Sequence, residues 1–201
     1  MMAAIFFAGF AAAVCCADIR TGIAFLALSL VFGGYCLFHG LKRVERFFIG
    51  ARGEEKVCGI LKNLPEKYHV FNDFIAGRMH VDHVVVGPAG VFAVETKFWR
   101  GRVTIEEGHI LVDGRLPSRA PLAQVQKEAA RVKAALFKKG WDGPVIPVLV
   151  FASDTFAAHI AEVDGAVILN ARELMDSFSV DRVVIPDADL ERLVTLMENN
   201  V

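Results

Sequence analysis

A predicted β-hairpin places two acidic side chains and a lysine on one face. Residues 81–97 form two apolar, β-branched segments joined by the turn sequence Gly-Pro-Ala-Gly at residues 87–90, which is a hairpin signal. A four-residue loop pairs Asp82 directly with Glu95 across the two strands. Because side chains alternate along a strand, Lys97 lies on the same face as both acids, at the end away from the turn.

This acid pair needs a physical reason, because carboxylates that face each other across two strands repel and lower stability. A divalent cation bound between Asp82 and Glu95 supplies one. Lys97 can then bind a phosphate, or orient or deprotonate a water molecule. The alternative is a solvated ion cluster at the end of a sheet. His80 shares the face of the acids by the same alternation and is a further candidate, although a lone histidine is more often structural.

The same residues belong to a longer pattern. From Asp82 to Gly101 the chain has the string D-H-x-x-V-x-x-x-G-x-F-x-x-E-T-K-x-x-x-G, and Gly53 and Glu54 precede it in a predicted helix. The pattern resembles the nuclease-related domain (NERD) family, which is grouped with the PD-(D/E)XK nuclease superfamily. The resemblance covers residues 50–139 and implies a restriction-endonuclease-like α/β fold.

The resemblance also implies roles for individual residues. It makes Asp82 and Glu95 metal ligands, with Mg²⁺ or Mn²⁺ as the expected cofactor, and Lys97 the catalytic lysine. It makes Glu54 the acidic residue of the first helix, and Gln124 the polar residue on the helix after the sheet. For Glu54 the alternative is a purely structural position in the first turn of a helix, where a carboxylate stabilises the helix dipole.

Basic and aromatic residues near the acid pair are candidates for substrate binding. An aromatic ring can stack on a base and an arginine can pair with a phosphate, although a tryptophan here can equally cap the core. Basic side chains at i+3 and i+7 from Gln124 can line the site with it or point to water. These candidates are Trp99, Arg100, Arg102, Lys127 and Arg131.

Residues 1–41 are predicted to form a two-helix transmembrane hairpin. Residues 2–17 and 22–41 contain no charged side chain, and the second segment is long enough to cross a bilayer. A cleaved signal peptide is the alternative for the first segment, but it lacks a basic n-region, and the second segment would still anchor the chain. Residues 42–49 form a basic linker, so the positive-inside rule places the following domain in the cytoplasm. The expected location is the bacterial inner membrane.

Residues 50–201 are predicted to form one α/β domain, a mixed central sheet flanked by helices. A helical pattern over residues 44–64 contains Gly50 and Gly53 near its start, which favour a bend or a short linker where the chain leaves the membrane. Apolar periodicity predicts the remaining elements: strands at 68–75, 103–105, 110–112, 145–152 and 166–169, and helices at 121–139, 171–177 and 187–199.

Charge is divided unevenly along the chain. Residues 42–139 contain 18 Lys and Arg against 11 Asp and Glu, whereas residues 140–201 contain 3 against 11. A polyanion would be attracted to the first part and repelled by the second, although ordinary solvated faces explain the division as well. The basic residues near the membrane can also bind an anionic lipid surface. The four cysteines have neither zinc spacing nor a disulfide pattern.

These observations predict a membrane-anchored hydrolase that depends on Mg²⁺ or Mn²⁺. It would be an endonuclease or exonuclease that cuts the phosphodiesters of nucleic acid, DNA in particular, as in DNA processing. Its partners would be nucleic acid and the lipid bilayer. The alternative is a non-catalytic module that binds nucleic acid or a protein at the membrane, which the absence of a strongly basic surface favours. A purely structural membrane-associated subunit is a third possibility.

Overall fold

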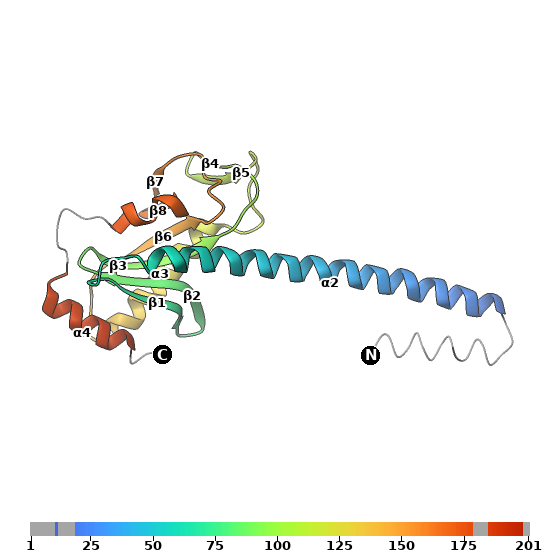
Figure 1. Cartoon of the computed structure of the whole chain (residues 1–201), viewed down its shortest axis with the longest axis horizontal. Helices are drawn as coiled ribbons and strands as arrows, with labels where there is room; N and C mark the ends of the chain where they lie inside the picture. Colours follow the sequence, from blue (N-terminus) through green and yellow to red (C-terminus); the bar gives the residue numbers. More distant parts are fainter. Residues whose placement is uncertain (1–10, 12–18, 179–184, 199–201) are drawn as a thin grey trace. The chain divides into compact units, whose positions relative to one another are not determined.

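The computed structural model describes residues 11, 19–178 and 185–198 (Figure 1). The chain divides into two compact units, Met1–Ile49 and Gly50–Val201. Helix α2, Ile19–Leu61, begins in the first unit and ends in the second.

Helix α2 is 43 residues long. Among the described helices, it is the one whose length and apolar composition suffice to cross a membrane. Many of its large apolar side chains are exposed, from Ile19 to Phe48. The predicted second span, residues 22–41, lies within this helix. The predicted first span, residues 2–17, lies outside the described residues apart from residue 11, so only one helix of the predicted hairpin is described.

The helix continues through Gly50 and Gly53, so no short linker interrupts it at these glycines. A glycine costs a helix only about 1 kcal/mol relative to alanine, and packing offsets this because Val57, one turn later, is fully buried against the sheet. Gly53 also permits close contact, since a Cβ at this position would lie 3.1 Å from the Cβ of Phe98. The basic residues 42–49 are therefore helical.

A six-stranded mixed sheet forms the centre of the second unit, in the order β1-β2-β3-β6-β8-β7. β3, β6 and β8 run parallel, and the other neighbours are antiparallel. β4 and β5 form a separate two-stranded sheet. The strands are β1 (His69–Ala76), β2 (Met79–Gly87), β3 (Gly90–Lys97), β4 (Val103–Glu106), β5 (His109–Val112), β6 (Val145–Phe151), β7 (Ile160–Val163) and β8 (Ala166–Asn170).

Helices cover both faces of the six-stranded sheet. On one face, α3 (Pro121–Phe137) and α4 (Asp187–Glu198) bury Val132 and Leu193 against β2 and β3. On the other face, the last turns of α2 bury Val57 against side chains that alternate with the first set along the same strands. The prediction of an α/β domain with a mixed sheet flanked by helices is confirmed.

Two elements of the last third differ from the prediction. The sequence predicts a helix over residues 171–177, but the structure has two 3₁₀ turns, η1 (Ala171–Glu173) and η2 (Met175–Phe178). The backbone N–H of Asn170 donates to the Glu173 carboxylate, and this capping box tightens the first turn. No pattern predicts β7, because its four residues at the sheet edge are too few for a periodic signal.

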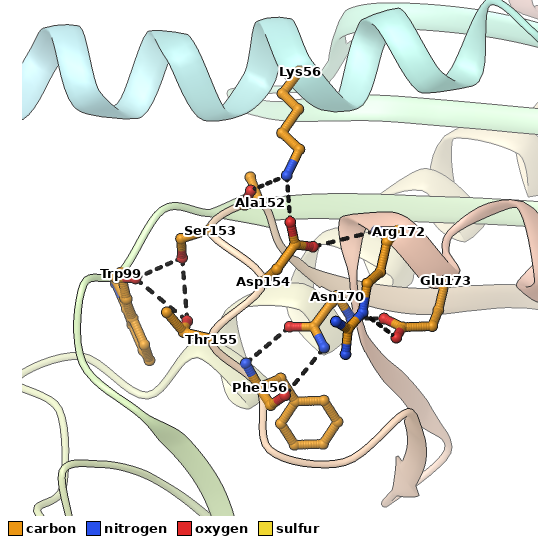
Figure 2. A network of polar contacts seen from close by, with 10 residues as sticks. All are labelled: Lys56, Trp99, Ala152, Ser153, Asp154, Thr155, Phe156, Asn170, Arg172 and Glu173. Atoms are coloured by element: carbon orange, nitrogen blue, oxygen red, sulfur yellow. Dashed lines mark hydrogen bonds and ion pairs between the residues drawn. The ribbon is translucent and has the colours of Figure 1, made fainter.

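A polar network ties together the carboxyl ends of the parallel strands (Figure 2). The Asn170 side chain is fully buried; it accepts a hydrogen bond from the N–H of Phe156 at 2.8 Å and donates to its carbonyl at 3.1 Å. Lys56 of α2 donates to the carbonyl of Ala152 at 2.8 Å and pairs with Asp154 at 2.6 Å. The loop that follows β6 is thereby held against β8 and α2.

The β2–β3 hairpin depends on close packing at Gly87. A Cβ at this position would lie 2.1 Å from the Tyr68 ring, which is held in place because its hydroxyl donates to the Phe178 carbonyl at 2.7 Å. We expect Gly87→Ala to lower the free energy of unfolding by about 1–3 kcal/mol, measured by urea unfolding of the full chain in mild detergent.

Gly59→Ala is the matched control for Gly87→Ala. Gly59 is an exposed helical position, and nothing lies within 4 Å of a Cβ placed there. The better helix propensity of alanine should raise stability at this position by up to about 1 kcal/mol. A Gly87→Ala protein as stable as the unchanged chain would contradict the packing described for Tyr68.

Candidate functional site

The antiparallel register of β2 and β3 brings Asp82 opposite Glu95. The two strands pair residue by residue from Gly87 with Gly90 to His83 with Val94, which is the register expected from a four-residue loop. Asp82 and Glu95 are the next pair in this register. The backbone N–H of Thr96 donates to Oδ2 of Asp82 at 2.8 Å, so the Asp82 carboxylate is turned toward β3.

The Glu95 carboxylate is the centre of the cluster. It is 4 % exposed, and its Oε1 accepts hydrogen bonds from Nζ of Lys97 and, at 2.7 Å, from Nε2 of Gln124. The same amide nitrogen of Gln124 donates to Oε1 of Glu128 at 2.9 Å. Gln124 and Glu128 lie one turn apart on α3, so this helix contributes two polar side chains to the face of β3 that carries Glu95.

Glu54 belongs to the same electrostatic environment. It lies on the exposed side of α2, and its negative charge helps to raise the pKa of Asp82. The five residues predicted as metal ligands or catalytic groups thus fall in one region. Asp82, Glu95 and Lys97 come from the hairpin, Gln124 from α3 and Glu54 from α2.

Burial and mutual repulsion make the carboxylates resist ionisation. Burial, followed by the charge of Glu95, raises the pKa of Asp82 to about 7. Burial also raises the pKa of Glu95 to about 7, although Lys97 opposes this shift, and burial raises the pKa of Glu128. One lysine therefore does not balance the negative charge gathered here. Such a cluster is suited to a positively charged ligand.

Glu128 is the residue that the sequence prediction missed. Its side chain is 3 % exposed, and its Oε2 has no hydrogen-bond partner among the described residues. The available signal was the spacing, because residues at i and i+4 share a helix face and Gln124 was already a candidate. The prediction instead named Lys127 and Arg131, which were expected either to line the site with Gln124 or to face water, and both are exposed to solvent.

The remaining substrate-binding candidates lie in different surroundings. Trp99 is half-buried and packs on Phe151 with ring centroids 5.4 Å apart, as expected for a residue that caps the core. His80 is exposed and pairs with Asp73 of β1 at 2.8 Å. The exposed candidates on the segment after β3 are Arg100 and Arg102.

The donor set fits a hard divalent cation. Mg²⁺ is commonly bound by one or two carboxylates together with water, and Asp82 and Glu95 provide two carboxylates from facing strands. The unpartnered buried oxygen of Glu128 fits the same chemistry. Among the residues that the structure describes, no three His, Cys, Asp or Glu side chains form a ready-made metal site. The cation that contacts Glu95 in the structure is the ammonium group of Lys97.

Comparison with known proteins gives one match. The family model of the nuclease-related domain matches residues 49–152, a segment that includes α2 from its Gly50 turn, both hairpins, α3 and β6. The matched segment contains the five predicted residues and Glu128: Glu54, Asp82, Glu95, Lys97, Gln124 and Glu128. No curated protein and no solved structure matches the chain.

The electrostatics predict that the metal-free protein loses stability as the pH rises. Asp82 and Glu95 keep their protons in the folded state up to about pH 7, whereas in the unfolded chain they titrate near pH 4. The folded state therefore binds more protons between these values, and stability should fall from about pH 4 to about pH 7. The measurement is urea unfolding in EDTA across this range.

Asp82→Asn tests the source of this pH dependence. The amide oxygen can still accept from Thr96, but the repulsion of Glu95 is gone. In EDTA at pH 8, we expect the variant to be more stable than the unchanged chain by about 1 kcal/mol, with a smaller fall between pH 4 and 7. Asp142→Asn, at an exposed position, is the control. A less stable Asp82→Asn protein would show that the carboxylate is not under electrostatic stress.

Proposed function

The chain belongs to the nuclease-related domain family, and we propose that it is a membrane-anchored, metal-dependent nuclease that cleaves the phosphodiesters of nucleic acid. The observation that supports this proposal is the pairing of half-buried Asp82 with buried Glu95, with Lys97 and Gln124 on the Glu95 carboxylate. The restriction-endonuclease-like assignment of the fold rests on an antiparallel β2–β3 hairpin followed by a parallel β6, with helices on both faces of the sheet.

Asp82 and Glu95, with the carbonyl of Thr96, are the groups that would hold Mg²⁺ or Mn²⁺. When bound, the ion supplies a Lewis acid that activates water and offsets negative charge at phosphorus. A divalent ion at this position would also remove the electrostatic cost of two facing carboxylates. The acid pair would then lower the stability of the metal-free protein but provide ligands for the ion in the metal-bound protein. Such a compromise between stability and activity is common at functional sites.

Lys97 would position the attacking water or stabilise negative charge on the phosphoryl oxygens. In the structure its ammonium is bound to Glu95, and its flexible four-carbon stem allows it to turn toward a substrate. Gln124 would keep the Glu95 carboxylate in one orientation by donating to Oε1. Glu54, on α2, would assist through a water molecule.

The membrane assignment is supported by α2. An exposed apolar helix of this length suits a lipid bilayer, and Lys42, Arg43 and Arg52 follow its apolar part. The positive-inside rule then favours a bacterial inner-membrane protein whose Gly50–Val201 unit faces the cytoplasm. DNA is the expected substrate, and the excess of basic residues over residues 42–139 would attract such a polyanion.

The alternative is a non-catalytic module that binds nucleic acid or a protein at the membrane. It is favoured by the engagement of Lys97 with Glu95 and by the acidic charge of residues 140–201, which repels a polyanion. Metal binding separates the two proposals, because the alternative has no need for an ion between Asp82 and Glu95.

Cleavage assays test the nuclease proposal. The full chain in mild detergent should cut supercoiled plasmid, linear single-stranded DNA or RNA in the presence of Mg²⁺ or Mn²⁺ and not in EDTA. Glu95→Gln and Lys97→Met should each lower the rate by about 100-fold or more. Lys133→Met, which changes an exposed lysine on α3, is the matched control and should cleave normally.

Two results would decide against this function. Cleavage that persists in Glu95→Gln would assign the activity to another site or to a contaminant. A folded wild-type chain that neither cleaves any of the three substrates nor binds Mn²⁺ would support the non-catalytic alternative.

The anchor is tested separately by fractionation. The full chain should stay in the membrane pellet after alkaline carbonate extraction, and deletion of residues 1–49 should release the remaining domain into the supernatant. A green fluorescent protein fused after Val201 should fluoresce, whereas a periplasm-dependent alkaline phosphatase fused there should be inactive. Release of the full chain by carbonate would contradict the anchor, and an active phosphatase fusion would reverse the orientation.

A further inference from the structure

Glu128 is held against the acid pair by a single amide group. Nε2 of Gln124 donates to Oε1 of Glu95 at 2.7 Å and to Oε1 of Glu128 at 2.9 Å. The same amide nitrogen therefore holds two buried carboxyl groups close to each other. Two carboxylates brought together in this way repel each other unless a cation lies between them.

The net charge of these side chains also favours a bound cation. Three carboxylates, on Asp82, Glu95 and Glu128, interact with one another, and Lys97 is the one cation that interacts with all of them. These four groups together carry a net charge of about −2 in their usual charge states, and Glu54 adds further negative charge beside Asp82. A divalent ion would offset this negative charge.

The second oxygen of Glu128 is available for such an ion. Oε1 is engaged by Gln124, but Oε2 is buried and has no hydrogen-bond partner among the described residues. A buried carboxylate oxygen without a donor is costly, and α3 has apolar residues at neighbouring positions on its buried side, Val125 and Ala129. A structural role on this helix face would be better filled by another apolar side chain.

We propose that Glu128 is a third carboxylate ligand of the divalent cation site, and that it binds the ion through Oε2 while Gln124 holds Oε1. This inference rests on the proposed function, because it assigns a further residue to the metal site of Asp82 and Glu95. It also gives Gln124 a role, because its amide aligns two carboxylates from different elements, one on β3 and one on α3.

The competing explanation is that Glu128 only positions Gln124. In that case Glu128 would act on Glu95 through the amide group, and its effect would disappear once Gln124 is removed. A ligand acts on the ion directly, so its effect remains in the absence of the amide. A double-mutant cycle separates these two roles.

The experiment measures Mn²⁺ binding to the full chain in mild detergent by isothermal titration calorimetry, without nucleic acid. The variants are Glu128→Gln, Gln124→Met, the double variant and Glu95→Gln. Glu191→Gln, on the exposed side of α4, is the matched control. Near-ultraviolet circular dichroism in EDTA checks that each variant is folded. If Glu128→Gln does not fold, Glu128→Met takes its place, because it keeps the side-chain volume without a polar group.

We expect Glu128→Gln to weaken Mn²⁺ binding by about 10-fold or more, both in the otherwise unchanged chain and in the Gln124→Met background. Glu191→Gln should bind as the unchanged chain does. The inference is overturned if Glu128→Gln binds Mn²⁺ within twofold of the unchanged chain. It is also overturned if its effect vanishes in the Gln124→Met background, since Glu128 is then a positioning residue.

Failure of this inference can be told apart from failure of the proposed function. If Glu95→Gln loses Mn²⁺ and Glu128→Gln does not, only the role of Glu128 is wrong. If the unchanged chain binds no Mn²⁺, or if Glu95→Gln binds it equally well, the metal site itself is wrong and both proposals fall.

Discussion

The electrostatic stress between Asp82 and Glu95 is the constraint on which the candidate site depends. The hairpin register places the two carboxylates on facing strands, and burial keeps solvent from screening them. Three donors offset this stress: the backbone N–H of Thr96 donates to Asp82, and Lys97 and Gln124 both donate to Glu95. Glu54 and Glu128 add further negative charge. The arrangement is costly in the free protein and favourable once a cation is present.

The connection between β3 and β6 determines which side chains complete the cluster. These strands are parallel neighbours, so the chain must cross from one end of the sheet to the other between them. The crossing contains the β4–β5 hairpin and α3, and α3 packs on β3 and β6. This packing puts Gln124 and Glu128 over Glu95. At the carboxyl edge of the same strands, the network around Asn170 and Asp154 fixes the loop after β6 (Figure 2).

Local patterns were sufficient for much of the fold. The β-branched segments and the Gly-Pro-Ala-Gly turn predicted the β2–β3 hairpin with its register, and apolar periodicity predicted α3, β6 and β8 close to their observed bounds. The errors have different causes. Gly53 stays helical where α2 packs close to Phe98, a contact between residues far apart in the chain. The residues after Asn170 form 3₁₀ turns that begin with a local capping box to Glu173.

The family match relates the cluster to a nuclease-related domain but does not define its chemistry. Residues 49–152 belong to a nuclease-related domain, and this segment contains every element that contributes a side chain to the cluster. Residues 153–201 add β7, β8 and α4, which complete the sheet and its core. The basic and acidic parts of the sequence thus correspond to the segment that bears the site and to a segment that supports it.

By itself, the sequence determined the pairing of Asp82 with Glu95 and the position of Lys97 beside them, because strand alternation and a short turn are local properties of the chain. Only the tertiary structure decided that Glu128 joins them, whereas Lys127 and Arg131 are exposed to solvent. Helical spacing shows which residues share a face, but the face that turns toward the sheet is chosen by burial of Val125, Val132 and Leu136. Burial also sets the charge state of the carboxylates, since it depends on contacts between residues far apart in the chain.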